Sequence, residues 1–280
     1  ETIQRDLSFE PPPLRRRFLY GLAQAAALPF ILTLNTVQWL GIFVTYILIT
    51  GGELGFFAEL LTLLAVYVAI VLTTGLIAVG AKWVILGKTK PGRYPLWGSY
   101  YFRWWLVKHL QPMLHIKWLQ ASPAMPLVMR MLGAKVGRDC IISDFNAGAM
   151  DLVTIGDRVA TGGKLKIANA EVIGNELVID EVVIGDDAYI GTSVVLGHVA
   201  RVGDFAELAD LTAIAPGAQI GRAEIWDGSP GRRVGTVDVE ALPEPPPVTP
   251  GRRRLLNVYY ALALICIPPV SLLPIFPGFY

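Results

Sequence analysis

From Ile184 onward, an aliphatic residue recurs at every sixth position. The next residue is always Gly or Ala. The residue four positions after each aliphatic has a short side chain in every repeat up to the one that contains Ala218. Neither a helix, with a period of 3.6, nor a strand, with a period of 2, gives such a series. We therefore predict a parallel β-helix of hexapeptide repeats, with the aliphatic and the short residue facing a narrow core and Gly permitting a tight turn. The aliphatic positions are Ile184, Ile190, Leu196, Val202, Leu208, Ile214 and Ile220.

The same pattern extends toward the N-terminus with two defects. Its earlier members are the pairs Val136-Gly137, Ile155-Gly156 and Ile173-Gly174. The irregular stretches Ser143–Asp151 and Ile173–Ile184 are expected to be bulges or extruded loops, where β-structures often place ligand sites. Glu224 would be an inward carboxylate, so the stack is expected to end near it.

Long apolar runs flank the repeats. Phe18–Gly52 is uncharged over 35 residues, about 52 Å as a helix, whereas a bilayer core needs only about 30 Å. Pro29 and the polar residues that follow it place the predicted first span at Phe30–Thr50. Leu60–Ala81, an uncharged run of 22 residues, is the predicted second span, and Leu255–Tyr280, interrupted by four prolines, is the predicted start of a third.

Basic residues predict the orientation of these spans. Three Lys/Arg clusters lie next to span ends, at Arg15–Arg17, Lys82–Arg93 and Arg252–Arg254, whereas the Gly51–Glu59 connection has no Lys or Arg. Because cytoplasmic loops carry an excess of Lys and Arg, all three clusters and the region Lys82–Arg254 are expected to face the cytoplasm.

An aromatic and basic stretch precedes the repeats, since five of the seven Trp residues lie between residues 83 and 118. This composition favours a helical segment in the headgroup layer, and the alternative is a soluble helical cap on the β-helix. The predicted segments are 1–93 (N-terminal segment and two transmembrane helices), 94–131 (interfacial segment), 132–236 (β-helix), 237–254 (Pro-rich linker) and 255–280 (start of a third transmembrane helix).

Composition narrows the classes of function. The 280 residues have a formal net charge of +1, which argues against a nucleic-acid partner. Hydrophobic residues make up 53% and charged residues 17% of the chain, with a mean hydropathy of +0.49. Two cysteines, Cys140 and Cys266, cannot form a disulfide scaffold. The chain begins at Glu1 without Met and stops in an apolar stretch, so we expect it to be part of a longer protein.

Two resemblances follow from these motifs. Three hexads per coil resemble the left-handed β-helix acyltransferases, so the expected fold is transmembrane α-helices plus an all-β left-handed parallel β-helix. The ordered set of spans, aromatic stretch and sequence motifs resembles the C-terminal region of membrane-bound nonribosomal-peptide-synthetase-like enzymes of the ε-poly-L-lysine synthetase type. The motifs are Leu132-Gly133-Ala134-Lys135-Val136-Gly137, Asp151-Leu152-Val153-Thr154-Ile155-Gly156-Asp157 and Trp226-Asp227-Gly228-Ser229-Pro230.

The second resemblance implies amide or isopeptide bond formation between a free amine and an amino acid held as a thioester on a 4′-phosphopantetheine arm. It implies a multi-pass protein of the bacterial inner (plasma) membrane with a cytoplasmic β-helix. The implied partners are the lipid bilayer, the carrier and adenylation domains of the same enzyme, and sister β-helix domains or a homo-oligomer. This chain has no Gly-Gly-Ser carrier site and no G-x-x-x-x-G-K-[ST] phosphate loop. We therefore expect it to bind no cofactor of its own and to receive the loaded arm as substrate.

Three side chains are candidates for catalysis, which requires a base to take the amine proton. His198 lies two residues after Leu196, at an outward turn position where the soluble acyltransferases often carry their base; the alternative is a solvated turn histidine. Asp144 and Asp151 flank an irregular stretch and are candidate bases or ammonium-binding groups; the alternative is turn capping. His109 and His115 are expected to face headgroups. The acidic cluster Asp180, Glu181, Asp186 and Asp187 is expected to be a solvated face that could attract a cationic amino acid.

A metal site is not expected, because only His198 among the histidines lies in the repeats. Three functions remain open. The chain is an amide-forming domain of a synthetase, a non-catalytic scaffold domain of the same enzyme, or a stand-alone membrane acyltransferase. Adenylation and carrier domains upstream would favour the first two.

Overall fold

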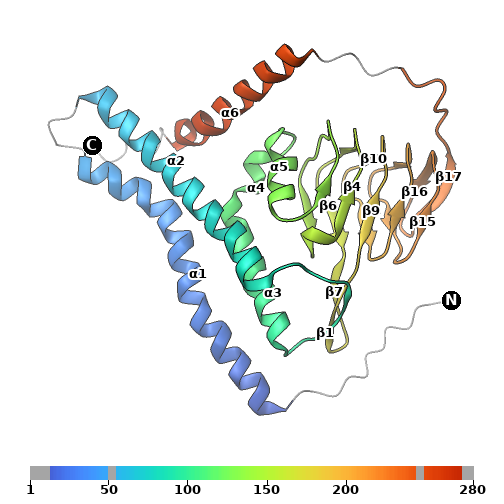
Figure 1. Ribbon diagram of the computed structural model, residues 1–280, viewed down its shortest axis with the longest axis horizontal. Coiled ribbons are helices and arrows are strands. Elements are labelled where there is room, and N and C mark those ends of the chain that lie inside the picture. Colours follow the sequence, from blue (N-terminus) through green and yellow to red (C-terminus); the bar gives the residue numbers. More distant parts are fainter. Residues whose placement is uncertain (1–12, 50–54, 244–248, 273–280) are drawn as a thin grey trace.

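The computed structural model describes residues 13–49, 55–243 and 249–272. A long helical hairpin and a bundle of short helices lie beside a β-helix (Figure 1). The helices are α1 (Leu14–Ile49), α2 (Phe56–Ala81), the π-helix η1 (Lys82–Leu86), α3 (Ser99–Leu110), the 3-10 helix η2 (Gln111–Leu114), α4 (Ile116–Leu119), α5 (Ala124–Met131), the 3-10 helix η3 (Met150–Leu152) and α6 (Pro250–Leu272).

The β-helix is made of three parallel sheets, and the chain visits each sheet in turn. One sheet contains β2 (Lys135–Val136), β4 (Val153–Ile155), β9 (Val182–Ile184), β12 (Arg201–Val202) and β15 (Gln219–Ile220). The second contains β5 (Ala160–Thr161), β10 (Tyr189–Ile190), β13 (Glu207–Leu208), β16 (Glu224–Asp227) and β17 (Arg232–Thr236). The third contains β3 (Phe145–Ala147), β6 (Leu165–Ala168), β11 (Val195–Gly197) and β14 (Ala213–Ile214). All pairings in these sheets are parallel except that of β17 with β16.

The predicted hexapeptide register is confirmed. Each of the seven aliphatic residues from Ile184 to Ile220 is buried, none more than 4% exposed. Residues one coil apart pair directly, as Leu196 does with Ile167 on one side and Ile214 on the other. The aliphatic residues therefore stack in three rows and form one continuous core. The left-handed sense of the coil stays a prediction.

The prediction that the repeated Gly permits the tight turn is wrong. In each turn, the residue three positions after the aliphatic has a positive backbone φ angle. Examples are Asp187 (56°) and Phe205 (58°). The Gly directly after the aliphatic has another task, since a Cβ on Gly185 would lie 2.3 Å from Asp204 Oδ1. Small residues at this position therefore allow neighbouring coils to approach closely.

Aspartates link the coils along the same corner. Oδ1 of Asp186 accepts from Asp157 N at 2.7 Å, and Oδ1 of Asp204 accepts from Asp186 N at 2.9 Å. Each carboxylate thus satisfies an amide of the previous coil, and Asp186 is a structural residue of this ladder. Asp187 instead pairs with Arg158.

The predicted coil position at Ile173-Gly174 is wrong. Ile173 is 42% exposed and ends β7 (Ala170–Ile173), which forms an antiparallel hairpin with β8 (Glu176–Ile179). The Ile-Gly pair belongs to a hairpin turn, with Gly174 at a φ of 61°. The hairpin leaves the coil and pairs with β1 (Gly92–Pro95) in a separate three-stranded sheet. The expected extruded loop is therefore real but begins before Ile173.

The two ends of the β-helix are covered. At the first coil, Met125 and Met129 of α5 and the following Leu132 join the core. At the last coil, Trp226 continues the aliphatic row by pairing with Leu208, and β17 then runs antiparallel to β16. The stack ends at Glu224 as expected, and its 18% exposed carboxylate accepts hydrogen bonds from Gly221 N and Trp226 Nε1, both at 2.9 Å.

Replacing Glu224 by Gln should lower stability at neutral pH and leave it unchanged in acid. The hydrogen bond from Trp226, the amide of Gly221 and the charge of Arg233 lower the pKa of Glu224 below its usual 4.5. A carboxyl group with a depressed folded-state pKa stabilises the fold above its unfolded pKa and loses that contribution as the pH falls through the folded value. Melting temperatures of the unmodified protein and of Glu224→Gln, measured from neutral pH to pH values below the folded-state pKa of Glu224, test the prediction. Glu240→Gln is the exposed control. A Glu224→Gln defect of equal size at every pH would contradict it.

The described parts of the first two predicted spans lie within the helical hairpin. Within the described residues, two stretches are long and apolar enough to cross a membrane, Leu14–Gln38 and Phe57–Leu86, and only 6% of an 18-residue apolar segment in each is buried. A shorter apolar stretch, Leu40–Ile49, completes α1. α1 continues through Pro29 without a break and contains the predicted Phe30–Thr50 span as far as Ile49, the last described residue of the helix. α6 covers the described part of the predicted third span, of which residues 273–280 lie outside the described residues.

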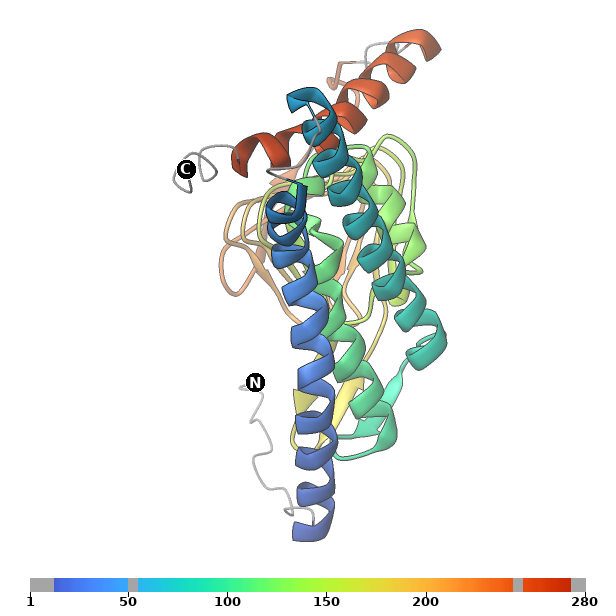
Figure 2. The same ribbon diagram turned by 90° about the vertical axis from the view of Figure 1, so that its left-hand side faces the viewer.

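The short helices pack against this hairpin, as Figure 2 shows for α3 beside α1 and α2. Gln38 Nε2 donates to Thr74 Oγ1 at 2.6 Å and to Met113 O at 3.1 Å, which ties α1, α2 and η2 together. The aromatic side chains of α3 are used in packing; Trp104 Nε1, for example, donates to Gly148 O of the first coil at 3.0 Å. The segment 94–131 is thus a helical layer between the hairpin and the β-helix.

Candidate functional site

His198 lies on an outer corner of the β-helix with a carboxylate beside it. It follows β11 directly, and Asp180 follows β8 at the base of the hairpin. His198 Nδ1 is 3.2 Å from Asp180 Oδ2, and the two side chains are 23% and 26% exposed. The two side chains are in close contact without hydrogen-bond alignment, since Nδ1 has no hydrogen-bond partner. A carboxylate at Nδ1 stabilises the protonated ring and leaves Nε2 as the nitrogen available to a substrate.

Asp180 is the residue that sequence reasoning missed. It was grouped with neighbouring acidic residues as a solvated face, and only the hairpin brings it to His198. The available signal was the irregular spacing between Ile173 and Ile184, which marks an insertion directly before β9. A residue at the base of an extruded hairpin can contact the next coil at the same corner.

Asp151 is a buried ion-pair partner. Its Oδ2 accepts from Lys82 Nζ at 3.1 Å and from Thr89 N at 2.6 Å, and the side chains of Lys82 and Asp151 are 3% and 5% exposed. Gly133, with a φ of 104°, passes so close that a Cβ there would lie 2.7 Å from the Asp151 Cβ. The position joins the end of α2 to the irregular part of the first coil.

Asp144 lies just before β3 and is half-buried. Its backbone carbonyl accepts from Leu165 N at 3.0 Å. The structure therefore does not gather the three predicted site residues: His198 meets Asp180, Asp151 meets Lys82, and Asp144 contributes a backbone contact.

Asn169 links the two charged sites. Its fully buried side chain accepts from Gly148 N and Ala149 N at 2.9 and 3.0 Å and donates to Ala149 O at 2.7 Å. Its carbonyl accepts from Asp180 N at 3.0 Å. The Asn169 side chain thus holds the loop that carries Asp151, and its backbone carbonyl holds the base of the hairpin that carries Asp180.

A narrow cleft beside Asp151 holds a second lysine. Lys108 Nζ donates to Asn146 Oδ1 at 3.1 Å and to Ala147 O. Burial lowers the pKa of Lys108 to about 8, so a fraction of its amine is neutral at physiological pH. Burial also raises the pKa of Tyr100 to about 12. Lys82, Lys108 and Asp151 all line the cleft.

The other histidines are elsewhere. His109 is exposed on α3, with Nδ1 2.8 Å from Trp105 O, and His115 has Nδ1 3.1 Å from Met113 O. In the described part of the chain, no three His, Cys, Asp or Glu side chains come together as a metal site would require.

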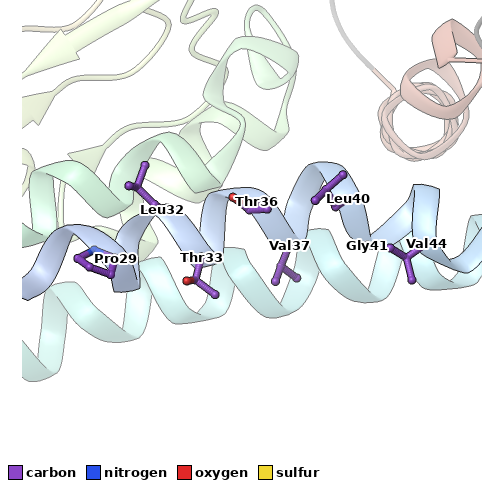
Figure 3. A pocket seen from close by; sticks show the side chains of 8 residues that line it. All are labelled: Pro29, Leu32, Thr33, Thr36, Val37, Leu40, Gly41 and Val44. Atoms are coloured by element: carbon purple, nitrogen blue, oxygen red, sulfur yellow. The ribbon is translucent and has the colours of Figure 1, made fainter.

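A shallow groove on α1 carries no candidate chemistry (Figure 3). It is lined by Pro29, Leu32, Thr33, Thr36, Val37, Leu40, Gly41 and Val44. These side chains are apolar apart from two hydroxyl groups, so the groove offers no titratable group for a reaction.

Comparisons with known proteins give one sequence relative. The δ-poly-L-ornithine synthetase of Acinetobacter baumannii (strain AB307-0294) is 33% identical over 265 residues, which cover 94% of this chain and 20% of that protein. The chain therefore spans about a fifth of the length of the relative that it matches. No family model matches.

Solved structures with hexapeptide repeats are more distant. A hexapeptide-repeat acetyltransferase of Vibrio cholerae O1 biovar eltor, complexed with acetyl coenzyme A, is 20% identical with a TM-score of 0.35, covering 38% of this chain and 61% of that one. The serine acetyltransferase of Neisseria gonorrhoeae is 15% identical with a TM-score of 0.31, covering 87% and 96%. At such scores these structures decide neither fold nor activity.

Proposed function

We propose that this chain is an acyl-transfer module of a larger synthetase, which joins amino acids through amide bonds. Two observations support the proposal: similarity to a poly-L-ornithine synthetase along nearly the whole chain, and a histidine paired with a carboxylate on an accessible corner of the β-helix. The second observation carries the chemistry, because aminolysis of a thioester needs a general base for the amine.

His198 takes the part of that base. The amine nitrogen attacks the thioester carbonyl carbon, the new C–N bond forms, and the C–S bond breaks. His198 Nε2 accepts the amine proton and returns it to the departing thiolate, while Asp180 at Nδ1 stabilises the protonated ring. The thioester would be carried on the 4′-phosphopantetheine arm of a carrier domain, with carrier and adenylation domains in other parts of the larger protein.

The membrane placement belongs to the same proposal. α1 and α2 would cross the bacterial inner membrane, with the β-helix on the cytoplasmic side and α6 leading into a third span. The largely exposed apolar faces of α1 and α2 support this placement. Arg253 pairs with Asp139 of the first coil, which keeps the third basic cluster on the β-helix side.

The test is polymer formation by the full-length synthetase with His198→Gln or Asp180→Asn. Loss of the base should slow amide formation from a preloaded carrier by about 10²–10⁴-fold, and loss of its partner should slow it less. Single-turnover release of the carrier thiol measures the step, at equal membrane expression. His109→Gln, an exposed histidine on α3, is the matched control.

The scaffold alternative makes the opposite prediction. If this β-helix only supports catalytic sister domains, all three variants should turn over at the unmodified rate while the protein remains folded. That result would remove His198 from the reaction.

A further inference from the structure

The charges of this chain are segregated despite the near-zero total. No Asp or Glu lies between Glu59 and Asp139, whereas that stretch contains ten Lys and Arg residues. Two of them, Lys82 and Lys108, have buried or hydrogen-bonded ammonium groups. Most of the others are exposed, including Lys88, Arg130 and Lys135. The charged residues of segment 60–138 are therefore all basic, and most of them lie on the surface.

An apolar patch interrupts this basic surface where α2 ends. Trp83 and Val84 of η1 are 46% and 87% exposed, and Leu127 and Met131 of α5 are 55% and 39% exposed. Trp83 Nε1 donates to Met131 O at 2.8 Å, which joins the two elements. We name Trp83, Val84, Leu127 and Met131 the junction patch.

Helix α5 is apolar on two sides for different reasons. Met125 and Met129, four residues apart, are buried in the core of the first coil. Leu127 and Met131, also four residues apart, form a separate stripe that faces outward. Arg130 lies exposed between them along the chain, with its guanidinium donating to Val136 O and Gly137 O. An outward apolar stripe with cationic neighbours is typical of a helix that lies in a membrane interface.

We propose that the junction patch is the contact of this protein with an anionic bilayer surface. Trp83, Val84, Leu127 and Met131 would enter the boundary between headgroups and acyl chains, and Arg130, Lys135 and Lys88 would face lipid phosphates. The inference rests on the proposed crossing by α2. Two observations carry it: the patch continues the apolar stretch Phe57–Leu86, and the chain has no Asp or Glu between Glu59 and Asp139, the stretch that contains the patch and the three cations.

The consequence is a fixed position for the β-helix. Because α5 covers the first coil, an α5 bound to the bilayer holds that coil against the membrane surface. The buried Lys82–Asp151 pair lies directly beneath, with Lys82 Nζ 3.5 Å from the centre of the Trp83 ring. The aromatic residues of α3, which pack inside the protein, do not make this contact.

Site-specific quenching by lipid tests the proposal on the full chain. In a Cys266→Ser background, a bimane label is placed at Val84→Cys, Leu127→Cys, Leu72→Cys in α2, or Val234→Cys on β17, where the wild-type residue is exposed. Each protein is reconstituted in nanodiscs of brominated phosphatidylcholine, with or without phosphatidylglycerol. We expect a fluorescence loss of about half or more at positions 84 and 127, as at position 72, and none at position 234.

The charges are tested separately. Arg130→Glu with Lys135→Glu should reduce quenching at position 127 in discs that contain phosphatidylglycerol, and the same changes should have little effect in pure phosphatidylcholine. An unchanged signal in both lipids would overturn the assignment of anionic lipid.

The remaining quenching patterns distinguish failure of the junction patch from failure of the membrane placement. Quenching at position 72 without quenching at 84 and 127 would overturn the patch while leaving the crossing by α2 intact. No quenching at position 72 would instead overturn the proposed membrane placement. A label at position 127 that is shielded from both lipid and a water-soluble quencher would mean that the patch is a protein interface, which also overturns the proposal.

Discussion

Replacing Asp151 by Asn should destabilise the chain by about 3–5 kcal/mol, because removing one partner of a buried ion pair leaves an uncompensated buried charge. Lys82 is only 3% exposed, and Thr89 N also depends on the same carboxylate oxygen. Chemical denaturation of the detergent-solubilised chain, followed by near-ultraviolet circular dichroism, measures the loss.

A double replacement separates structure from catalysis at this position. Lys82→Met with Asp151→Leu removes both charges and should recover a large part of the loss, because an apolar pair carries no desolvation penalty. The exposed pair Arg93–Glu176, 73% and 46% exposed, is the control; Arg93→Met should cost at most about 1 kcal/mol. If Asp151→Asn kept normal stability but abolished amide formation, Asp151 would be a working residue of the reaction instead.

Replacing Leu196 by Asp should cost several kcal/mol, because it buries an unpaired charge or a protonated carboxyl in the middle of the stack. Leu196 is fully buried between Ile167 and Ile214 of the adjacent coils. The matched change Leu196→Met conserves volume and should cost less than about 1.5 kcal/mol. Thermal unfolding of both variants checks the pair, and a melting temperature of Leu196→Asp near that of the unmodified chain would contradict the register.

The β-helix could be predicted because its signal is local and repeated. Each hexad meets the same steric demand, so seven successive positions such as Leu196 report one packing rule. Ile173-Gly174 has the residue types of the repeat but not its buried position, because an Ile before a Gly also suits a hairpin turn. Spacing alone cannot tell these two uses apart.

The charged contacts could not be predicted because they join distant segments. Lys82 and Asp151 are 69 residues apart, and nothing local distinguishes Lys82 from the exposed lysines that follow it. Asp180 reaches His198 only because the hairpin returns the chain to the same corner. His198 itself was identifiable, since its position relative to Leu196 fixes an outward turn. The structural role of Asn169 could not be predicted from the sequence, because it consists of three simultaneous side-chain hydrogen bonds to another coil.

The covers at both ends of the coil stack limit how the protein can associate and how it can change in length. A parallel stack exposes a full row of unpaired amides and carbonyls at each end, which is a template for unlimited end-to-end fibre growth. Here α5 covers the apolar core at one end, and at the other β17 pairs antiparallel with the outer edge of β16. The regular coils between these covers pair mainly with their neighbours, so the stack can gain or lose a whole coil there and still fold. Outside extruded hairpins such as β7–β8, length variation among relatives of this domain should therefore come in steps of about eighteen residues, one complete coil of three hexads.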